Sequence, residues 1–227
     1  MSEAAPDTGA VAPAARLRRR ILGSRARVAI IASALVIWLM DAVVSRFLIG
    51  RGAITGVEAD TVNLFETIGT AIFFVTLIVL IVAVVRGWTI GMLRIVAVYL
   101  AFSVVQVAIS VFSMLASVTS RTEVGLTSLY DVLVMYMFSV TVFTFVYLYL
   151  DISTPRGAFV WPARDGEEPP TPNLIDYLFI SLNVNATYGP TSEAVMSRPA
   201  KLIMGVQVLL AILMLTVLIS RAVAATS

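Results

Sequence analysis

The sequence predicts an all-α membrane protein, a bundle of five transmembrane helices with one short re-entrant or interfacial helix before the last span. Composition is the first observation: 59% of the residues are hydrophobic, 13% are charged and the mean hydropathy is +0.94. Soluble domains have about 45–50% apolar and about 25% charged residues. The second observation is a set of five charge-poor apolar runs, each approaching the roughly 20 residues that cross a bilayer core. The third is a half-apolar segment, 174–195, too short to span and ending in a polar turn with Gly189 and Pro190.

The first 27 residues predict a disordered basic tail, because an Ala- and Pro-rich start and a basic run cannot form a core. The arginines of this run are Arg16, Arg18, Arg19, Arg20, Arg25 and Arg27. An apolar run follows, as in a secretory signal, but no small-residue cleavage site precedes Asp41 and further apolar runs come later. The sequence therefore predicts a retained first span, with residues 28–227 forming one integral membrane domain.

The apolar runs predict spans at residues 28–49, 67–85, 95–117, 132–150 and 202–220. Short polar loops join the second span to the third and the third to the fourth, so these helices are expected to be antiparallel neighbours. The connection at 151–173 is rich in Pro and acidic residues, and Pro at this density cannot continue a helix. We expect an extended loop that lies over the bundle, followed by a short half-helix at 174–195.

The basic residues are divided unequally between the two sides of such a bundle. With a cytoplasmic N-terminus, the inner flanks hold the six tail arginines, Arg86, Arg94, Arg156, Arg164, Arg198 and Lys201. The outer flanks hold Arg46, Arg51, Arg121 and Arg221, so the division is twelve to four. Because cytoplasmic flanks carry the excess of Lys and Arg, the sequence predicts a multi-pass plasma-membrane protein with its N-terminus in the cytoplasm.

Several classes of function are excluded by composition. The chain has no Cys and no His, which removes disulfides, thiolate nucleophiles, the usual zinc sites and imidazole acid–base chemistry. No phosphate-binding loop, nucleophile elbow or row of span arginines is found. The net charge of +2 is concentrated beside the first span rather than spread over a soluble face. We therefore expect no enzyme activity, no cofactor, no metal and no nucleic-acid partner.

Segment 174–195 is the best candidate for a functional site, because irregular backbone at membrane depth is tolerated only when buried in protein or lining a water-filled cavity. Its candidate ion-path residues are Asn183, Asn185, Thr187, Tyr188, Gly189, Thr191 and Ser192. Three alternatives remain open: an interfacial helix with tyrosines at headgroup depth, a re-entrant loop that lines a cavity, and another arrangement such as a short true span. Asn183 and Asn185 are two residues apart and do not share a helix face closely, which indicates that the helix is ending or that one of them caps a turn.

The predicted spans also contain polar residues: Asp41, Gln106 and Gln207. A carboxylate at the centre of a span costs roughly 2.5–3.5 kcal/mol, so Asp41 should face the bundle and find a partner. Arg46, Gln106 and Tyr136 are the alternatives, and proton or cation handling by Asp41 is a functional hypothesis. Gln207 is expected to bridge two helices.

Three further carboxylates, Glu66, Asp131 and Asp151, lie near predicted span ends. We expect them to reach the membrane interface or to cap helices. Tyr147 and Tyr149, close to Asp151, predict an interfacial aromatic belt.

The last third of the chain carries a set of residues that matches one family. The matching positions are Trp161, Pro162, Pro169, Pro170, Asp176, Leu178, Phe179, Ser181, Thr187, Thr191, Ser192, Ser197 and Arg198. On these residues the chain resembles a family of bacterial five-span membrane proteins known only as a domain of unknown function. That family usually has an acidic residue at the position of Ser192, and Glu193 is the neighbouring carboxylate here. The resemblance implies a bacterial inner-membrane location and no particular activity.

The order of fourth span, half-helix, Thr-containing turn and last span is similar to the pore module of two-span potassium channels. In that module the filter is Thr-Val-Gly-Tyr-Gly-Asp, whose carbonyl oxygens replace the hydration shell of a cation. Here the turn at 187–192 is Thr-Tyr-Gly-Pro-Thr-Ser, and Pro190 fixes φ at about −65° where glycine is needed. The resemblance implies a pore built from hydroxyl and Asn side chains rather than a potassium-type filter.

Two functions follow as alternatives. The first is an ion channel or transport protein, a homo-oligomer in the lipid bilayer that passes monovalent cations near residues 183–191. The second is a non-conducting structural or accessory subunit of a membrane complex.

Overall fold

The computed structural model describes residues 33–44, 46, 57–86, 89–116, 127–163, 169–189 and 193–224. The predicted tail, and with it the start of the first span, lies outside these residues, as do Thr191 and Ser192. Within the described ranges the chain is mostly helical. The all-α class is therefore confirmed.

The helices are Ser33–Val44, α3 (Val57–Arg86), α4 (Thr89–Ala116), α5 (Thr127–Ser153), α6 (Leu174–Asn185) and α7 (Arg198–Ala224). Three stretches are long and apolar enough to cross a membrane: Gly91–Ala116, Leu129–Ser153 and Arg198–Val223. These correspond to the third, fourth and fifth predicted spans. The first two predicted spans are represented by shorter apolar helical stretches, Ser33–Val44 and Thr67–Val79.

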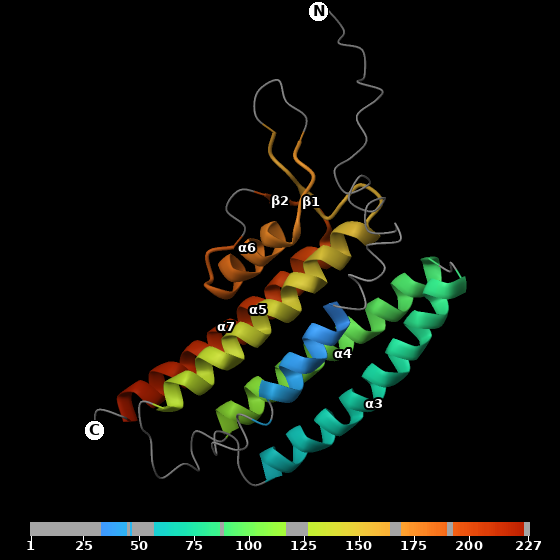
Figure 1. Ribbon diagram of the computed structural model, residues 1–227. Coiled ribbons are helices and arrows are strands. Elements are labelled where there is room, and N and C mark those ends of the chain that lie inside the picture. The colour runs from blue at the N-terminus through green and yellow to red at the C-terminus, as the bar shows by residue number, and fades with distance from the viewer. Residues whose placement is uncertain are drawn as a thin grey trace, which may run out of the picture.

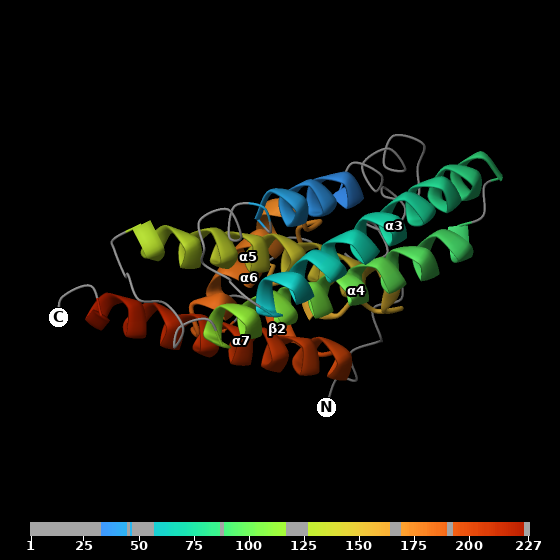
Figure 2. The same cartoon turned by 90° about the horizontal axis from the view of Figure 1, so that it is seen from below.

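The helices form two antiparallel pairs that lie side by side (Figure 1). One pair is α3 with α4 and the other is α5 with α7, and α4 also packs on both members of the second pair. Helix Ser33–Val44 joins the first pair, where Trp38 stacks on Phe73 with ring centroids 4.8 Å apart. In both views α6 lies against the α5–α7 pair, on which it packs (Figure 2).

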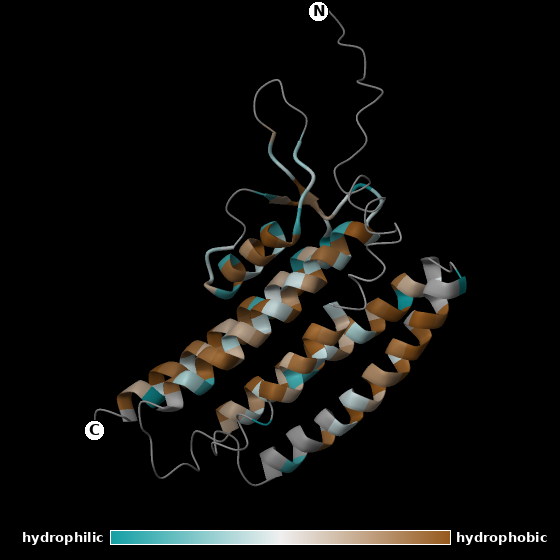
Figure 3. Cartoon of the chain, in the orientation of Figure 1, coloured by the Kyte–Doolittle hydropathy of each residue, from teal (hydrophilic) through white to brown (hydrophobic). Residues whose placement is uncertain are grey.

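Hydrophobic residues occupy much of the length of each long helix (Figure 3), and many of them are exposed. On α7 the exposed side chains include Leu202, Leu209, Ile212, Leu215, Ile219 and Val223. Soluble monomers rarely expose contiguous apolar patches larger than a few hundred Å². Such exposed apolar side chains, together with the composition and the three long apolar helices, are compatible with a membrane-embedded protein.

Two local signals position α6. Asn173 precedes the helix, accepts a hydrogen bond from the Ile175 amide at 2.7 Å and donates its own amide to Asp176 at 2.6 Å. This capping box satisfies amides that have no partner inside the helix. Beyond α6 the chain returns as β2 (Ala194–Val195), which pairs antiparallel with β1 (Phe159–Val160). The sequence predicted an extended loop over β1 and a half-helix that continued to residue 195, whereas α6 ends at Asn185 and residues 194–195 form β2. Two-residue strands leave no periodic pattern in the sequence.

Asp151, near the end of α5, is fully buried with 0% of its surface exposed. Its carboxylate accepts hydrogen bonds from the amides of Ala158 and Phe159 at 2.6 and 3.1 Å. It also accepts from the Trp161 indole at 3.4 Å and from the Tyr177 hydroxyl at 2.6 Å. The prediction of an interfacial or capping role was wrong, because the chain folds back over α5 and supplies four donors.

Tyr177, at the start of α6, is buried against this carboxylate. Burial, followed by the negative charge of Asp151 and its hydrogen bond, raises the pKa of the Tyr177 hydroxyl above its ordinary value. The hydroxyl therefore stays protonated and donates, which fixes the upper end of α6 on α5.

Asp131 and Arg221 form a buried ion pair at the opposite end of the α5–α7 pair. The side chains are 1% and 2% exposed, and Nη1 of Arg221 lies 3.4 Å from Oδ2 of Asp131. Asp131 does not reach the membrane interface as predicted, because its side chain is buried against Arg221. A partner 90 residues along the chain cannot be recognised from local spacing. The side chain of Glu66 lies outside the described residues.

Candidate functional site

The depth to which α6 reaches is the first feature of the site. The helix begins beside Asp151, and its Ser181 hydroxyl donates to the Val140 carbonyl at 2.9 Å. Val140 lies eleven residues before Asp151, about 16 Å lower along α5 at 1.5 Å per residue. The chain then returns to pair β2 with β1, close to Asp151 again. Measured along α5 and α7, the segment 174–195 therefore reaches the middle of these two helices and returns to the end that contains Asp151.

A polar cluster joins α5, α6 and α7 at this half height, and we call it the Gln207 cluster. Its members are Ser139, Tyr147, Ser181, Asn185 and Gln207. All five side chains are buried. Gln207 Oε1 accepts from the Tyr147 hydroxyl, and Nε2 donates to the carbonyl and hydroxyl oxygens of Ser181 at 3.0 and 3.1 Å. Gln207 therefore bridges three helices.

The position of Tyr147 in this cluster corrects the sequence interpretation. Its ring is fully buried and its hydroxyl is committed to Gln207. Tyr147 therefore does not belong to an interfacial belt. Tyr147 lies on the side of α5 that faces α7, whereas Tyr149 lies on another side of the helix and is only partly buried.

The orientation of the Asn185 amide follows from the cluster. Nε2 of Gln207 must donate to the Ser181 carbonyl, which can only accept. Oδ1 of Asn185 lies 3.4 Å from the same Nε2 and 3.3 Å from the Ser139 hydroxyl oxygen. If the Asn185 amide were turned by 180°, its NH₂ group would face Nε2 of Gln207, and two donors would meet. Nδ2 therefore points away from the cluster, and it has no hydrogen-bond partner among the described residues although Asn185 is only 4% exposed.

Asn185 also lines a cavity of about 270 Å³ below the end of α6. The other lining residues are Val132, Tyr136, Ala186, Thr187, Ala211, Met214, Leu215 and Leu218. The cavity exists because α6 has only 12 residues. Beyond its end, α5 and α7 continue without a third described helix in the groove between them.

The turn after α6 is a Schellman motif, in which amides of the turn bond back to the last carbonyls of the helix. The Thr187 amide donates to Val184 at 3.0 Å, and the Tyr188 amide donates to Asn183 at 2.9 Å. The motif requires a left-handed residue at Thr187, and this residue has φ of 64°. Glycine is usual at this position, so a β-branched Thr is strained.

Thr187→Gly is expected to stabilise the protein by up to about 1 kcal/mol, because it removes a left-handed penalty of roughly 1–2 kcal/mol while adding chain entropy to the unfolded state. Unfolding titrations with sodium dodecyl sulfate (SDS) would measure the change. Thr216→Gly, on the exposed helical part of α7, is the control and should destabilise. Equal destabilisation by both variants would contradict the strain at Thr187.

Of the predicted ion-path residues that the structure describes, Asn185 and Thr187 line the same cavity, and Asn183, Tyr188 and Gly189 do not line it. Asn185 points into the bundle, whereas Nδ2 of Asn183 donates to the Phe179 carbonyl of its own helix at 3.0 Å. Thr187 is exposed and Tyr188 is 81% exposed. Gly189 has φ of 73° and completes the turn. The helix ends at Asn185, in agreement with the spacing of the two asparagines.

A second polar pair lies between helix Ser33–Val44 and α4. Nε2 of Gln106 donates to Oδ2 of Asp41 at 2.6 Å, and both side chains are buried. Gln106 was one of the three predicted partners. Gly69 of α3 leaves the room for this amide, because a Cβ there would lie 2.5 Å from Gln106 Nε2.

Gly69→Ala is expected to displace the Gln106 amide from Asp41 and to destabilise the fold by about 1–2 kcal/mol, despite the better helix propensity of Ala. The SDS unfolding midpoint would report the loss. Gly205→Ala is a matched control, since a Cβ at that position meets no atom within 4 Å. If Gly69→Ala and Gly205→Ala stabilised the protein to a similar extent, the close approach of Gly69 to the Gln106 amide would be unimportant.

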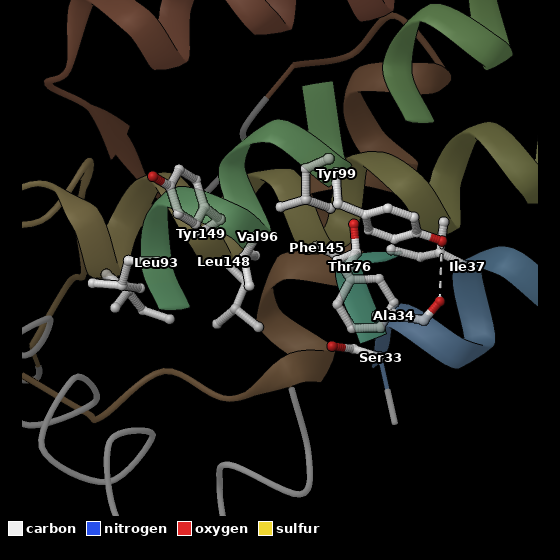
Figure 4. Close-up of a pocket in the computed structure, with 12 residues that line it drawn as sticks. Ser33, Ala34, Ile37, Thr76, Leu93, Val96, Tyr99, Phe145, Leu148 and Tyr149 are labelled. Carbon is white, nitrogen blue, oxygen red and sulfur yellow. Dashed lines mark hydrogen bonds between the residues drawn. The ribbon is translucent and has the colours of Figure 1, made fainter. Parts of the chain in front are cut away.

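A second, smaller cavity of about 60 Å³ lies between helix Ser33–Val44, α3, α4 and α5. Its lining is almost wholly apolar, and the Tyr99 hydroxyl donates to the Ala34 carbonyl at 3.2 Å (Figure 4). With this hydroxyl already bonded, the cavity offers little to a polar ligand.

Sequence reasoning missed Ser139, Ser181 and Tyr147 as partners of Asn185 and Gln207. The only available signal was their helical spacing: Ser181 and Asn185 are four residues apart and share a face of α6. Among the described residues, no group of His, Cys, Asp and Glu side chains is suited to hold a metal ion. Comparisons of the chain with protein-family models, with curated proteins and with solved structures find no match.

Proposed function

We propose that this protein is a five-span protein of a bacterial inner membrane that acts as a non-conducting accessory subunit of a membrane complex. The observation that carries the proposal is that only two of the described ion-path residues, Asn185 and Thr187, share a cavity. Asn185 is held in the Gln207 cluster, Asn183 bonds its own helix and Tyr188 faces outward. A cation path needs several oxygens that converge on one point.

The carbonyl groups at the end of α6 support the same proposal. A filter must present main-chain carbonyls to the ion, and the negative end of a helix dipole can assist. In α6, the carbonyls of Leu182, Asn183 and Val184 already accept hydrogen bonds from amides of the turn. These oxygens are occupied by the Schellman motif.

The outward face of α6 suits an apolar environment. Ile175, Leu178 and Phe179 are exposed, whereas the polar side chains Ser181 and Asn185 are buried. An interfacial helix would direct a polar face to water. The face of α6 is therefore fitted to lipid or to an apolar partner, and a re-entrant placement is favoured over an interfacial one.

The five spans and the orientation belong to this proposal. Ser33–Val44 and Thr67–Val79 are apolar helical stretches at the two remaining predicted spans. The twelve-to-four division of Lys and Arg supports a cytoplasmic N-terminus, with the re-entrant segment opening to the cytoplasm.

An ion channel is the second candidate, and the depth of α6 is the observation that favours it. The segment enters to half height and returns at the same end, which is the path of a pore loop. In a homo-oligomer, the exposed Thr187 and Tyr188 of several copies would surround a common axis and pass monovalent cations.

Cation flux into liposomes that contain the purified protein tests both candidates. We expect no K⁺ or Na⁺ flux above that of empty liposomes. Thr187→Cys and Gly189→Cys, at the deep end of the re-entrant segment in the Cys-free chain, should be protected from a membrane-impermeant thiol reagent with or without K⁺. Lys201→Cys, exposed at the start of α7, is the control and should react. Flux that is blocked by modification at residue 187 would establish the channel and overturn the accessory role.

A further inference from the structure

We infer that the end of the bundle where α7 begins binds an anionic phospholipid, and that Arg156, Arg198 and Lys201 hold its phosphate-containing headgroup. This surface is separate from the candidate ion path, and the inference does not depend on whether the protein conducts ions.

Main-chain hydrogen bonds bring the three cations together from two distant parts of the sequence. The Ser197 amide donates to the Ala158 carbonyl at 3.3 Å, beside the β1–β2 pair (Figure 1). Arg156 lies two residues before Ala158, and Arg198 follows Ser197 directly. Lys201 lies three residues beyond Arg198 in α7, so the two side chains share one side of the helix. The fold therefore places three basic residues around one point.

The charges of these residues are not balanced by the described part of the chain. All three side chains are exposed, and none of them forms an ion pair or a hydrogen bond with another described residue. Of the described acids at this end, Asp151 is buried, Asp176 belongs to the capping box of α6, and Glu193 has a buried Oε2. Like charges held close together repel one another, and a bound anion relieves this repulsion.

The surface beside the cations is apolar, which selects a lipid rather than a soluble anion. Leu202, next to Lys201, is 71% exposed, and Met196 is 65% exposed. Leu209 continues this apolar face along α7, and Gly205 leaves open space between Leu202 and Leu209, because a Cβ there would meet no atom within 4 Å. An acyl chain can lie along this face while the cations reach the phosphate, since Lys and Arg keep their stems on apolar surface and their heads in the polar layer.

Three cations favour a headgroup with a net negative charge. Phosphatidylglycerol carries one negative charge, whereas phosphatidylcholine also carries a positive group that the cations repel. Each Lys or Arg near the membrane surface adds to the attraction for anionic lipid. The guanidinium groups can bind phosphate through two parallel hydrogen bonds, and Lys201 adds a point charge.

Native mass spectrometry of the full-length protein in detergent would count the lipids that bind during titrations with phosphatidylglycerol and with phosphatidylcholine of the same acyl chains. The first phosphatidylglycerol is expected to bind about tenfold more tightly than the first phosphatidylcholine, or better, because three cations attract the anionic headgroup. Raising the salt concentration from about 0.1 M to about 1 M should remove most of this preference, since the Debye length falls from about 10 Å to about 3 Å.

A triple variant and two controls test the cations. Arg156→Gln, Arg198→Gln and Lys201→Gln together should bring the two affinities within about twofold of each other. The charge-preserving variant, with Arg156→Lys, Arg198→Lys and Lys201→Arg, should retain the preference for phosphatidylglycerol. Arg46→Gln removes an exposed cation from another part of the chain and should leave the preference unchanged. Because all four positions are exposed, the SDS unfolding midpoint should change little in each variant.

Equal affinity of the native protein for the two lipids would overturn the inference, and so would a preference that survives the triple Gln variant. Loss of the preference in the charge-preserving variant would overturn the electrostatic basis of the site. Displacement of phosphatidylglycerol by an equal concentration of glycerol phosphate would assign the surface to a soluble phosphate and overturn the role of lipid. These results are independent of the flux measurement, so this inference and the proposed function can fail separately.

Discussion

Asp151→Ala is expected to destabilise the protein by roughly 3–5 kcal/mol. The carboxylate accepts two main-chain amides, one indole and one phenol hydroxyl, and it is fully buried. Alanine would leave all four donors without this acceptor. Each unsatisfied buried donor costs about 1–3 kcal/mol, and the four costs are not additive because the loop can relax.

The measurement is the midpoint of SDS unfolding, followed by the near-ultraviolet signal of Trp161 and the surrounding aromatic rings. Asp60→Ala, which removes an exposed carboxylate from α3, is the control and should change the midpoint little. Asp151→Asn should lie between the native protein and Asp151→Ala, since one oxygen remains to accept the two amides. A native-like midpoint for Asp151→Ala would show that the loop does not depend on this carboxylate.

Arg221→Met is expected to destabilise the protein by about 3–5 kcal/mol, because it leaves the carboxylate of Asp131 buried without its countercharge. The two groups lie 3.4 Å apart and join the start of α5 to the last turn of α7. The negative end of the α7 dipole adds to the favourable position of the guanidinium.

A double variant separates the value of the pair from the cost of breaking it. Asp131→Leu combined with Arg221→Met should regain most of the lost stability, because replacing a buried ion pair with apolar residues is often neutral or stabilising. Arg198→Met, at the exposed opposite end of α7, is the control and should have little effect. If the double variant were as unstable as Arg221→Met alone, the loss would come from packing of the Arg stem rather than from the unpaired charge.

Helix positions could be predicted well from this sequence. Apolar runs placed the last three spans within a few residues of Gly91–Ala116, Leu129–Ser153 and Arg198–Val223. The spacing of two asparagines indicated a helix end or a turn cap near residue 185, where α6 ends, although the half-helix was predicted to run to residue 195. Both properties are local, since they depend on residues one to four positions apart and on the length that a bilayer requires.

Polar contacts between helices were predicted less well. Gln106 was named as a partner of Asp41, but only as one of three. Asp131, Asp151 and Tyr147 were assigned to span ends or to the interface, and all three are buried. Each has partners between seven and 90 residues away along the chain. Periodicity identifies the inward face of a helix and leaves open which residue of another helix meets it.

The sequence by itself determined that this is an all-α membrane protein, where its long helices lie, and which short segment is irregular. These properties follow from hydropathy and backbone chemistry, which act over one or two helical turns. Only the tertiary structure decided that α6 reaches the middle of the α5–α7 pair, that Gln207 fixes the direction of the Asn185 amide, and that a cavity lies below it. These features depend on the register in which three helices pack, and that register is set by the shapes and hydrogen bonds of side chains that are distant in sequence.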